Sequence, residues 1–434
     1  MLRPSTIVRK VLTRIWLFRV FVAMQTVSRN ISRTEENTTL KISPIAAFDG
    51  NNHSPRPRAH SNNDKTYCNY KNKFSGVSEK GTHVVFLHFG LPRTEFYAKG
   101  QLRQAAAIYY QVPKNAERFI PTSFLMNGKI RDCIAKYGES ECIEESLNRL
   151  TQRIQGSLNT VMPEFELISC SNAFLLDEPS IEQHLVEVGK GGCSRIVLMP
   201  FYPHFSCAQS GALLNEAERV LQTFTVPSTI DGKEVPNERI VPNSSESFHV
   251  SALHRWSSHP VVSEYWLNIL QPIRDNYGGV LFCAPALRGY NSREFRRLVW
   301  SSCERVMAGL SDSLPWKLAF FNAWDQWNLP VRDSVRAQAA RLSTQLSGGK
   351  AMAVIPISSF VPDFNTFCVL PNLLKTVDEA VLLEPQPDSA VLLQGMVEVI
   401  KNHLLGRRNA QLRSRCNWCI NSQCEQMRST LIDS

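Results

Sequence analysis

The sequence predicts an α/β protein with two units of similar plan, each a parallel sheet flanked by helices. Two observations lead to this fold class. Short apolar runs alternate with longer segments of helical spacing, which is typical of parallel strands covered on both faces. The 434 residues are also too many for one ordinary core, and the alternation occurs twice along the chain.

The first unit is predicted over residues 82–250. Its strands are the apolar runs 83–90, which ends in a turn containing glycine, and 196–200. Helical spacing follows over 131–158 and 181–188. Three prolines, a glycine and an Asn-Ser-Ser run indicate an inserted loop over 224–247.

The second unit is predicted over residues 251–405. Its strands are expected at 279–284, 317–321, 351–356 and 380–383, and its helices at 292–310, 333–346 and 391–405. Ligands of such Rossmann-like domains bind beyond the carboxyl ends of the strands. The residues that directly follow each apolar run are therefore the candidate site residues.

The composition excludes several classes of protein. With 43% hydrophobic and 20% charged residues, the chain is neither a coiled coil, nor collagen, nor disordered throughout. Its apolar runs all fall short of the roughly 18 residues that a membrane-spanning helix needs. We therefore expect a globular protein without a transmembrane segment.

The net charge of +9 belongs mostly to residues 1–34, which carry seven Arg and Lys residues and no acidic residue. The remainder has a balance of +2, so we expect no nucleic-acid surface. Arginines interrupt the apolar residues of 7–24, which indicates a basic amphipathic helix and favours a mitochondrial targeting leader over a secretory signal. A basic tail or a surface-binding helix is the alternative. Residues 35–80, rich in Asn, Ser, Thr and Pro, are predicted to be a disordered linker.

The tail, residues 406–434, contains three cysteines at C-x2-C-x4-C spacing: Cys416, Cys419 and Cys424. Three thiolates at this spacing are able to bind one inorganic centre, but both zinc and a [2Fe–2S] cluster need a fourth ligand. From the spacing alone, zinc, an iron–sulfur cluster and unliganded thiols all stay open.

Three motifs then carry a resemblance to a known family. The stretch 199–211, MPFYPHFSCAQSG, resembles the Y-P-Q-Y-S-x-x-T-x-G motif of the ferrochelatases, which insert Fe2+ into protoporphyrin IX. Residues 87–92, LHFGLP, resemble the family's first-strand L-N-x-G-x-P, and residues 255–260, RWSSHP, resemble its R-W-x-x-H. The resemblance spans about 82–428 and implies the chelatase fold and a lyase of haem biosynthesis.

The resemblance also bears on the cysteines and on the location. In animal ferrochelatases, one Cys of the first motif and three of a C-terminal C-x2-C-x4-C bind a [2Fe–2S] cluster. Cys207, Cys416, Cys419 and Cys424 match these positions, which favours the cluster over zinc. The family implies the mitochondrial matrix, with an apolar lip that contacts the inner membrane; residues 97–126 are the candidate lip.

The family's catalytic positions are altered. Pro285 stands where the resemblance places the catalytic His that accepts pyrrole protons, and proline has no proton-accepting side chain. Asp363 and Asn365 stand where the family has a His and a Glu. Ser171-Asn172 replaces an Arg-Tyr pair that follows an early strand, and residues 321–327 depart from a Y-Q-S-R-x-G-P segment.

We therefore expect a ferrochelatase-like pseudoenzyme that keeps the [2Fe–2S] site and inserts Fe2+ poorly. A porphyrin or haem would bind in a cleft with four aromatic candidates: Phe89, Tyr202, Phe205 and Trp324. The alternative is an active ferrochelatase. A third hypothesis is an iron–sulfur sensing or scaffold protein that forms a homodimer or pairs with an active ferrochelatase through the family's dimer surface.

Overall fold

The computed structural model describes residues 81–90, 142–165, 167–224, 238–241, 247–286, 292–311, 314–321, 333–346 and 349–407, with Met427 and Leu431. All of these belong to one compact unit of the chain. The predicted leader, 1–34, and the predicted linker, 35–80, lie outside the described residues. The cysteines of the tail and Trp324 also lie outside them.

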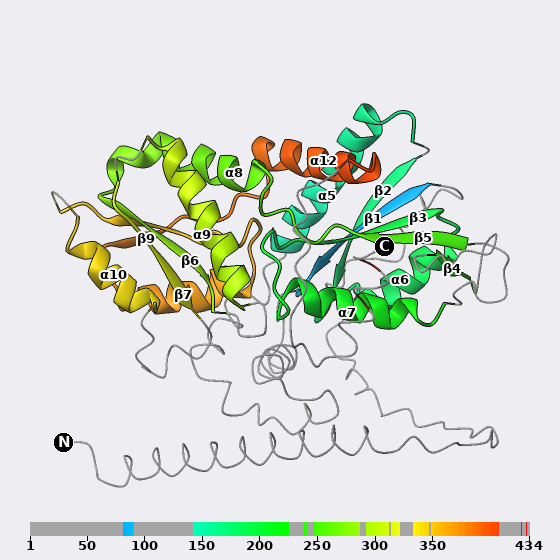
Figure 1. The fold of residues 1–434 in the computed structure, drawn as a ribbon, viewed down its shortest axis with the longest axis horizontal. Helices are drawn as coiled ribbons and strands as arrows, with labels where there is room; N and C mark the ends of the chain where they lie inside the picture. Colours follow the sequence, from blue (N-terminus) through cyan, green and yellow to red (C-terminus); the bar gives the residue numbers. More distant parts are fainter. Residues whose placement is uncertain are drawn as a thin grey trace, which may run out of the picture. The chain divides into compact units, whose positions relative to one another are not determined.

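The first sheet has five described strands in the order β2-β1-β3-β5-β4 (Figure 1). They are β1 (Thr82–His88), β2 (Ile168–Phe174), β3 (Arg195–Pro200), β4 (Glu238–Ile240) and β5 (Ser247–Ala252). All pairs are parallel except β4 with β5. The helices of this half are α5 (Cys142–Val161), α6 (Ile181–Lys190) and α7 (Ser210–Leu221).

The second sheet is parallel throughout its described strands, in the order β7-β6-β8-β9. Its strands are β6 (Gly279–Pro285), β7 (Trp316–Phe321), β8 (Met352–Ile355) and β9 (Ala380–Leu382). The helical elements are α8 (Val261–Leu270), a 3-10 turn η3 (Gln271–Asn276), α9 (Ser292–Gly309), α10 (Val335–Ser343), a π-helix η5 (Asn365–Val369), α11 (Leu370–Leu374) and α12 (Ala390–Leu404). The predicted α/β class is confirmed.

Alternation along the strands explains why both faces of each sheet are covered. In β1, Val84 and Phe86 enter one apolar cluster, whereas Val85 and Leu87 enter another on the opposite face. Strand β6 divides its side chains in the same way. The cluster that contains Val84 also contains residues of β6, β8, α8, α9 and α12, so one core is common to both sheets.

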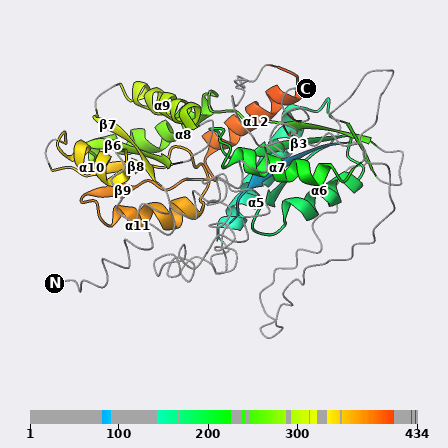
Figure 2. The same cartoon turned by 60° about the horizontal axis from the view of Figure 1, so that its bottom comes forward.

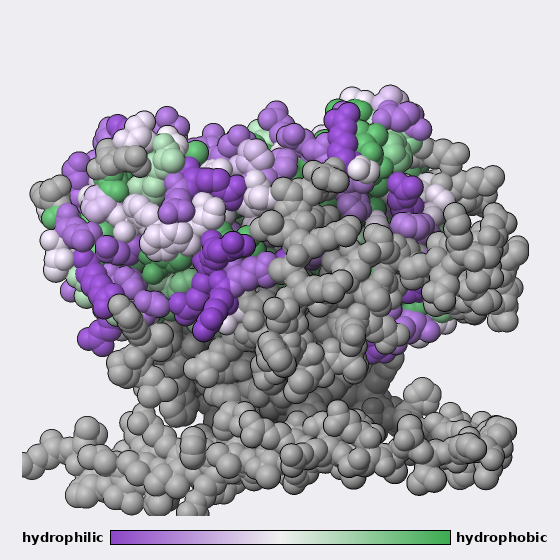
Figure 3. Space-filling view, viewed as in Figure 1, coloured by the Kyte–Doolittle hydropathy of each residue, from purple (hydrophilic) through white to green (hydrophobic). Residues whose placement is uncertain are grey.

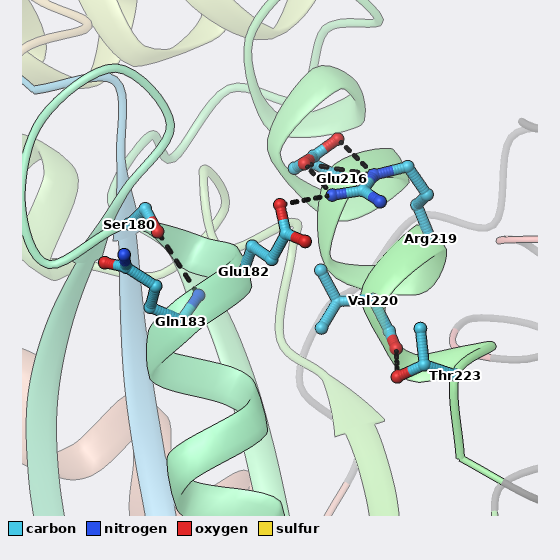
Figure 4. Close-up of polar contacts among 7 residues, drawn as sticks. All are labelled: Ser180, Glu182, Gln183, Glu216, Arg219, Val220 and Thr223. Atoms are coloured by element: carbon cyan, nitrogen blue, oxygen red, sulfur yellow. Dashed lines mark hydrogen bonds and ion pairs between the residues drawn. The ribbon is translucent and has the colours of Figure 1, made fainter. Parts of the chain in front are cut away.

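Helices α6 and α7 lie side by side on the first half (Figure 2). Helix α6 begins where the Ser180 hydroxyl accepts a hydrogen bond from Gln183 N at 3.2 Å, an ordinary N-cap. Arg219 of α7 joins the two helices, because its Nη2 lies 3.0 Å from Glu182 Oε2 and 2.7 Å from Glu216 Oε1 (Figure 4). The pair with Glu182 is exposed and the pair with Glu216 is part-buried, and pairs of this kind contribute about 0–1 kcal/mol each.

The structure differs from the sequence prediction in three places. Strand β2 was not predicted, because its sequence ISCSNAF mixes polar with apolar residues. Strand β4 lies within 224–247, the predicted inserted loop, and β5 extends to Ala252, past the predicted boundary at 250. Helix α12 contacts both α8 and α5, so a helix predicted in the second unit also covers the first half (Figure 1).

Candidate functional site

A cavity lies at the carboxyl edge of the first sheet, where β1, β2 and β3 end. Three stretches of the chain enclose it besides the strand ends: the first turns of α5, the loop after β2 and the segment before η5. Its described lining consists of His88, Gly90, Glu144, Leu147, Phe174, Asp177, Tyr202, Val361, Pro362 and Asp363. Residues from both halves of the chain therefore meet at the place where parallel sheets bind ligands.

His88, the last residue of β1, is the titratable base of this cavity. Only 4% of it is exposed, and its ring stacks on Phe201 at a centroid distance of 5.2 Å. Its Nε2 lies 3.2 Å from Asn172 Oδ1. Burial lowers the pKa of His88 to about 4, although the hydrogen bond with Asn172 acts in the opposite direction. The imidazole is therefore neutral at pH 7.

Asn172 of β2 holds His88 within a polar network. Its Oδ1 also accepts a hydrogen bond from Thr151 Oγ1 at 3.0 Å, and its Nδ2 donates to Asn148 Oδ1 at 3.0 Å. Both partners are on α5. The network therefore fixes the side-chain orientation of Asn172 before any ligand binds.

Asp363 brings a carboxylate to the cavity from the second half. Its Oδ1 accepts a hydrogen bond from Thr366 N at 2.9 Å, and Ser359 Oγ donates to its Oδ2 at 3.3 Å. The pKa of Asp363 is raised by burial, against the effect of these hydrogen bonds. Tyr202 lines the same cavity, and burial together with the nearby Asp363 charge raises its pKa. The phenol therefore stays protonated at neutral pH.

Gly90 fixes the approach of β1 to the loop after β2. Its φ is +87°, in the left-handed region that favours glycine. A Cβ at this position would lie 2.5 Å from Asp177 Cβ, so any larger residue would displace the loop. Leu175 N and Leu176 N donate to the carbonyls of His88 and Phe89, which holds the loop along the end of β1.

Comparison with known proteins shows the family to which this chain belongs. A family model described as Ferrochelatase matches residues 84–363, which is more than half of the chain and includes both halves of the cavity. This chain belongs to the ferrochelatase family.

Its similarity to individual relatives is low. The mitochondrial ferrochelatase of Schizosaccharomyces pombe is 25% identical over 300 residues, 63% of this chain and 65% of that protein. The mitochondrial ferrochelatase of Drosophila melanogaster is 23% identical over 296 residues, 63% of this chain and 70% of that protein. The chain thus spans less than two thirds of the length of the Schizosaccharomyces pombe relative.

Two solved structures of the chelatase SirB from Bacillus subtilis are also similar. The structure titled as SirB with Fe3+ is 12% identical and covers 74% of this chain and 95% of its own, with a TM-score of 0.38. The structure of sirohydrochlorin chelatase SirB in complex with cobalt is 10% identical and covers 74% and 96%, with a TM-score of 0.40.

The sequence prediction that Pro285 stands at the family's base position concerns the carboxyl end of β6. Pro285 is the last residue of that strand, is buried and pairs in register with Phe321 of β7. Neither Pro285 nor Asn365, the first residue of η5, belongs to the described lining of the cavity. Asp363 does, and it also caps the helical segment that follows it through its bond to Thr366 N.

Ser171 and Asn172, which the sequence resemblance matches to the family's Arg-Tyr pair, lie inside β2 rather than after a strand. The sequence alone predicts no strand at these residues, because polar side chains interrupt the apolar run of β2. Asn172 orients His88, whereas Ser171 Oγ lies 2.7 Å from His83 Nε2 and 2.6 Å from His184 Nε2 on the other face of the sheet. The two polar residues therefore serve separate networks.

Of the three described aromatic candidates for the porphyrin pocket, Tyr202 alone belongs to the described lining of the cavity. Tyr202 lines the cavity, and Phe89 packs edge-on against it at a centroid distance of 5.9 Å. Phe205 is 3% exposed and lies in the apolar core, with the Arg255 guanidinium 4.5 Å above its ring. Trp324 is outside the described residues.

Of the four cysteines that the sequence predicts as cluster ligands, only Cys207 is described. Cys207 is half-buried in the turn before α7, and a Cβ on Gly211 would lie 3.9 Å from its Cβ. Cys416, Cys419 and Cys424 lie outside the described residues. Met427 and Leu431, however, are buried in the same apolar cluster as Tyr202 and Phe205. The end of the tail therefore packs on the half of the chain that carries Cys207.

The membrane-contacting lip expected at residues 97–126 is outside the described part of the chain. None of the described helices is long and apolar enough to span a membrane. On the described surface in Figure 3, hydrophilic residues predominate and hydrophobic ones form small patches. The exposed large apolar residues of the described part of the chain are spread over both halves: Val161, Leu167, Trp300, Val381 and Leu405.

Proposed function

We propose that this member of the ferrochelatase family binds a porphyrin or haem at the carboxyl edges of its sheets and inserts Fe2+ inefficiently or not at all. Pro285 carries the proposal. It occupies the carboxyl end of β6, where the family has its proton acceptor, and its buried ring has no proton-accepting atom. Loss of a general base typically costs about 10²–10⁴-fold in rate.

The described cavity has a volume of about 30 Å3, enough for one or a few water molecules rather than a tetrapyrrole. Residues 91–141 and 322–332, which follow β1 and β7, are not part of that description. Among the described residues, a porphyrin would contact Tyr202, which lines the cavity, and Phe89, which packs against Tyr202.

The test is an anaerobic insertion assay with Fe2+ or Zn2+ and protoporphyrin IX. We expect saturable quenching of porphyrin fluorescence with no rise in metalloporphyrin absorbance above the protein-free rate. The double variant Pro285→His with Asn365→Glu should gain insertion activity, and Ala286→His with Asn365→Glu is the matched control. Turnover by the unmodified protein that a cavity substitution abolishes would refute the pseudoenzyme proposal.

An active ferrochelatase is the second candidate, and the His88 imidazole in the cavity is the observation that favours it. In that case the His88 imidazole at the end of β1 takes the place of the histidine that the family has at the position of Pro285. Turnover that His88→Ala abolishes, while porphyrin quenching stays unchanged, would favour this candidate over the first.

We further propose that Cys207, Cys416, Cys419 and Cys424 hold a [2Fe–2S] cluster, with zinc as the alternative. The packing of Met427 and Leu431 supports it, since it brings the tail to the half that carries Cys207. The purified protein should be brown, and Cys419→Ser should remove the visible spectrum, whereas the buried Cys193→Ala should not. A colourless protein with stoichiometric zinc would contradict the cluster.

We propose a mitochondrial location from the basic leader, and the relatives named as mitochondrial proteins support it. Residues 1–34 fused to a fluorescent reporter should direct it to mitochondria. Replacement of the seven Arg and Lys residues of this segment by Gln should leave the reporter in the cytosol.

A further inference from the structure

A second group of polar side chains lies away from the cavity, on the face of the first sheet that α12 covers. We propose that Arg195, His249 and His403 form a binding site for a tetrahedral oxyanion of the phosphate or sulfate type. The site is at the amino end of β3, whereas the cavity is at the carboxyl edge of the same sheet. It therefore does not depend on the proposed tetrapyrrole function.

Strand register brings Arg195 and His249 together. Arg195 is the first residue of β3 and is the in-register partner of His249 on the parallel strand β5. Neighbouring strands are about 4.8 Å apart, and side chains at paired positions point to the same face. Val197, two residues after Arg195, belongs to the apolar cluster that includes α12, so this face is the one beneath α12.

The last turn of α12 adds the third group. His403 Nε2 lies 2.9 Å from the Oγ of Ser251, which is two residues after His249 and therefore on the same face of β5. Two strand residues span about 7 Å, which is close to the size of an oxyanion with a hydrogen bond on each side. Arg195, His249 and His403 are all half-buried, so a small ion can reach them without displacing the apolar core.

The described residues give this site little counter-charge. Within the described part of the chain, the Arg195 guanidinium forms no ion pair or hydrogen bond, and His249 Nδ1 is buried without a hydrogen-bond partner. The acid that faces His249 is Glu238, its partner on β4, which accepts a hydrogen bond from Ser247 Oγ. Polar groups left without partners are unfavourable, and an oxyanion would supply acceptors for them.

The titration of the histidines agrees with an excess of positive charge. The pKa of His403 is lowered to about 4, mainly by burial and also by Arg195 and His249. The pKa of His249 is lowered by burial and by Arg195, while Glu238 acts in the opposite direction. Burial lowers the pKa of His254, which follows β5, and His403 adds to this effect. A bound anion would raise these pKa values, so binding takes up protons and strengthens as the pH falls.

The test is the stabilisation of the full-length protein by sulfate, measured as the melting temperature at constant ionic strength with chloride as the reference anion. Sulfate stays a dianion between pH 8 and 6, so a change in its affinity over this range reports protons taken up by the protein. We expect a rise in melting temperature that saturates, with tighter binding at the lower pH. Inorganic phosphate and glycerol phosphate at one pH then distinguish a free oxyanion from a phosphate ester, and binding of either supports the site.

Four variants locate the anion. Arg195→Gln should weaken sulfate binding at least about tenfold, because it removes the charged donor of the site. His403→Gln keeps a hydrogen-bond partner for Ser251, so it should weaken binding less and reduce the pH dependence. Glu238→Gln removes the facing carboxylate and should strengthen binding. Arg219→Gln, on α7 and outside the site, is the matched control and should leave the sulfate affinity unchanged.

Two results would overturn the proposal. One is a melting temperature that rises no more with sulfate than with chloride at equal ionic strength. The other is an equal sulfate affinity of the unmodified protein and a folded Arg195→Gln variant, which would place the anion elsewhere. Because no porphyrin is added, a failure of porphyrin binding leaves this measurement unaffected.

Discussion

Mild acid should destabilise this protein strongly, because it buries several neutral histidines away from the cavity. His83, His184, His204 and His254 are each at most 3% exposed. Burial lowers the pKa to about 3 for His83, His204 and His254 and to about 4 for His184. In the unfolded chain the same groups have a pKa near 6.5, so between about pH 6.5 and 4 the unfolded state binds more protons.

The sign and size of the effect follow from this difference. A lowered folded-state pKa gives stability that is fully present above pH 6.5 and is lost as the pH falls toward the folded-state pKa. At pH 5.5, protonation of one unfolded histidine costs the folded state about 1.4 kcal/mol, and the four together about 6 kcal/mol. That loss is comparable with the total stability of an ordinary domain, about 5–15 kcal/mol.

Urea unfolding followed by tryptophan fluorescence between pH 7.5 and 5.5 measures this dependence. The stability should fall by about 1.2 kcal/mol per pH unit and per histidine near pH 5.5. His204→Gln keeps a polar partner for Ser302, whose Oγ lies 2.9 Å from His204 Nε2. The variant should reduce the dependence of stability on pH by the contribution of one histidine. The reasoning is refuted by a stability that does not change over this range, or by an unchanged slope in the variant.

Two further perturbations test the packing. Gly395→Ala in α12 places a Cβ 2.1 Å from Val261 Cγ2 of α8. The melting temperature should therefore fall, with a net loss of stability of about 1–3 kcal/mol despite the better helix propensity of Ala. An unchanged melting temperature would mean that α8 and α12 move apart without cost and would contradict the tight packing. Glu218→Gln removes the counter-charge of Arg239, both groups being at most 3% exposed and 3.6 Å apart, and should cost about 3–5 kcal/mol by urea unfolding. Arg219→Ala, which removes pairs that are exposed or only part-buried, is the control and should change stability by less than about 1 kcal/mol. Equal losses in the two variants would contradict the role of burial.

Sequence reasoning recovered the elements that a continuous apolar run or a helical period specifies. Strands β1 and β6 are buried on both faces, and the apolar runs Val84–Leu87 of β1 and Val280–Ala284 of β6 make them recognisable in the sequence. Strand β2 cannot be recognised from the sequence alone, because Ser169, Ser171 and Asn172 interrupt its apolar run. Those residues are tolerated inside the sheet only because histidines and other polar side chains from β1, α5 and α6 bond to them.

The sequence by itself determined the family, through motifs whose spacing lies within single strands and turns, and it showed that Pro285 cannot accept a proton. Only the tertiary structure decided what surrounds the cavity, because His88 and Asp363 come from different halves of the chain. It also decided how the His88 ring is held, since its Nε2 lies 3.2 Å from Asn172 Oδ1 in a neighbouring strand and Thr151 of α5 donates to the same oxygen. Hydrogen bonds between elements distant in sequence have no period or spacing along the chain, and therefore they become visible only after folding.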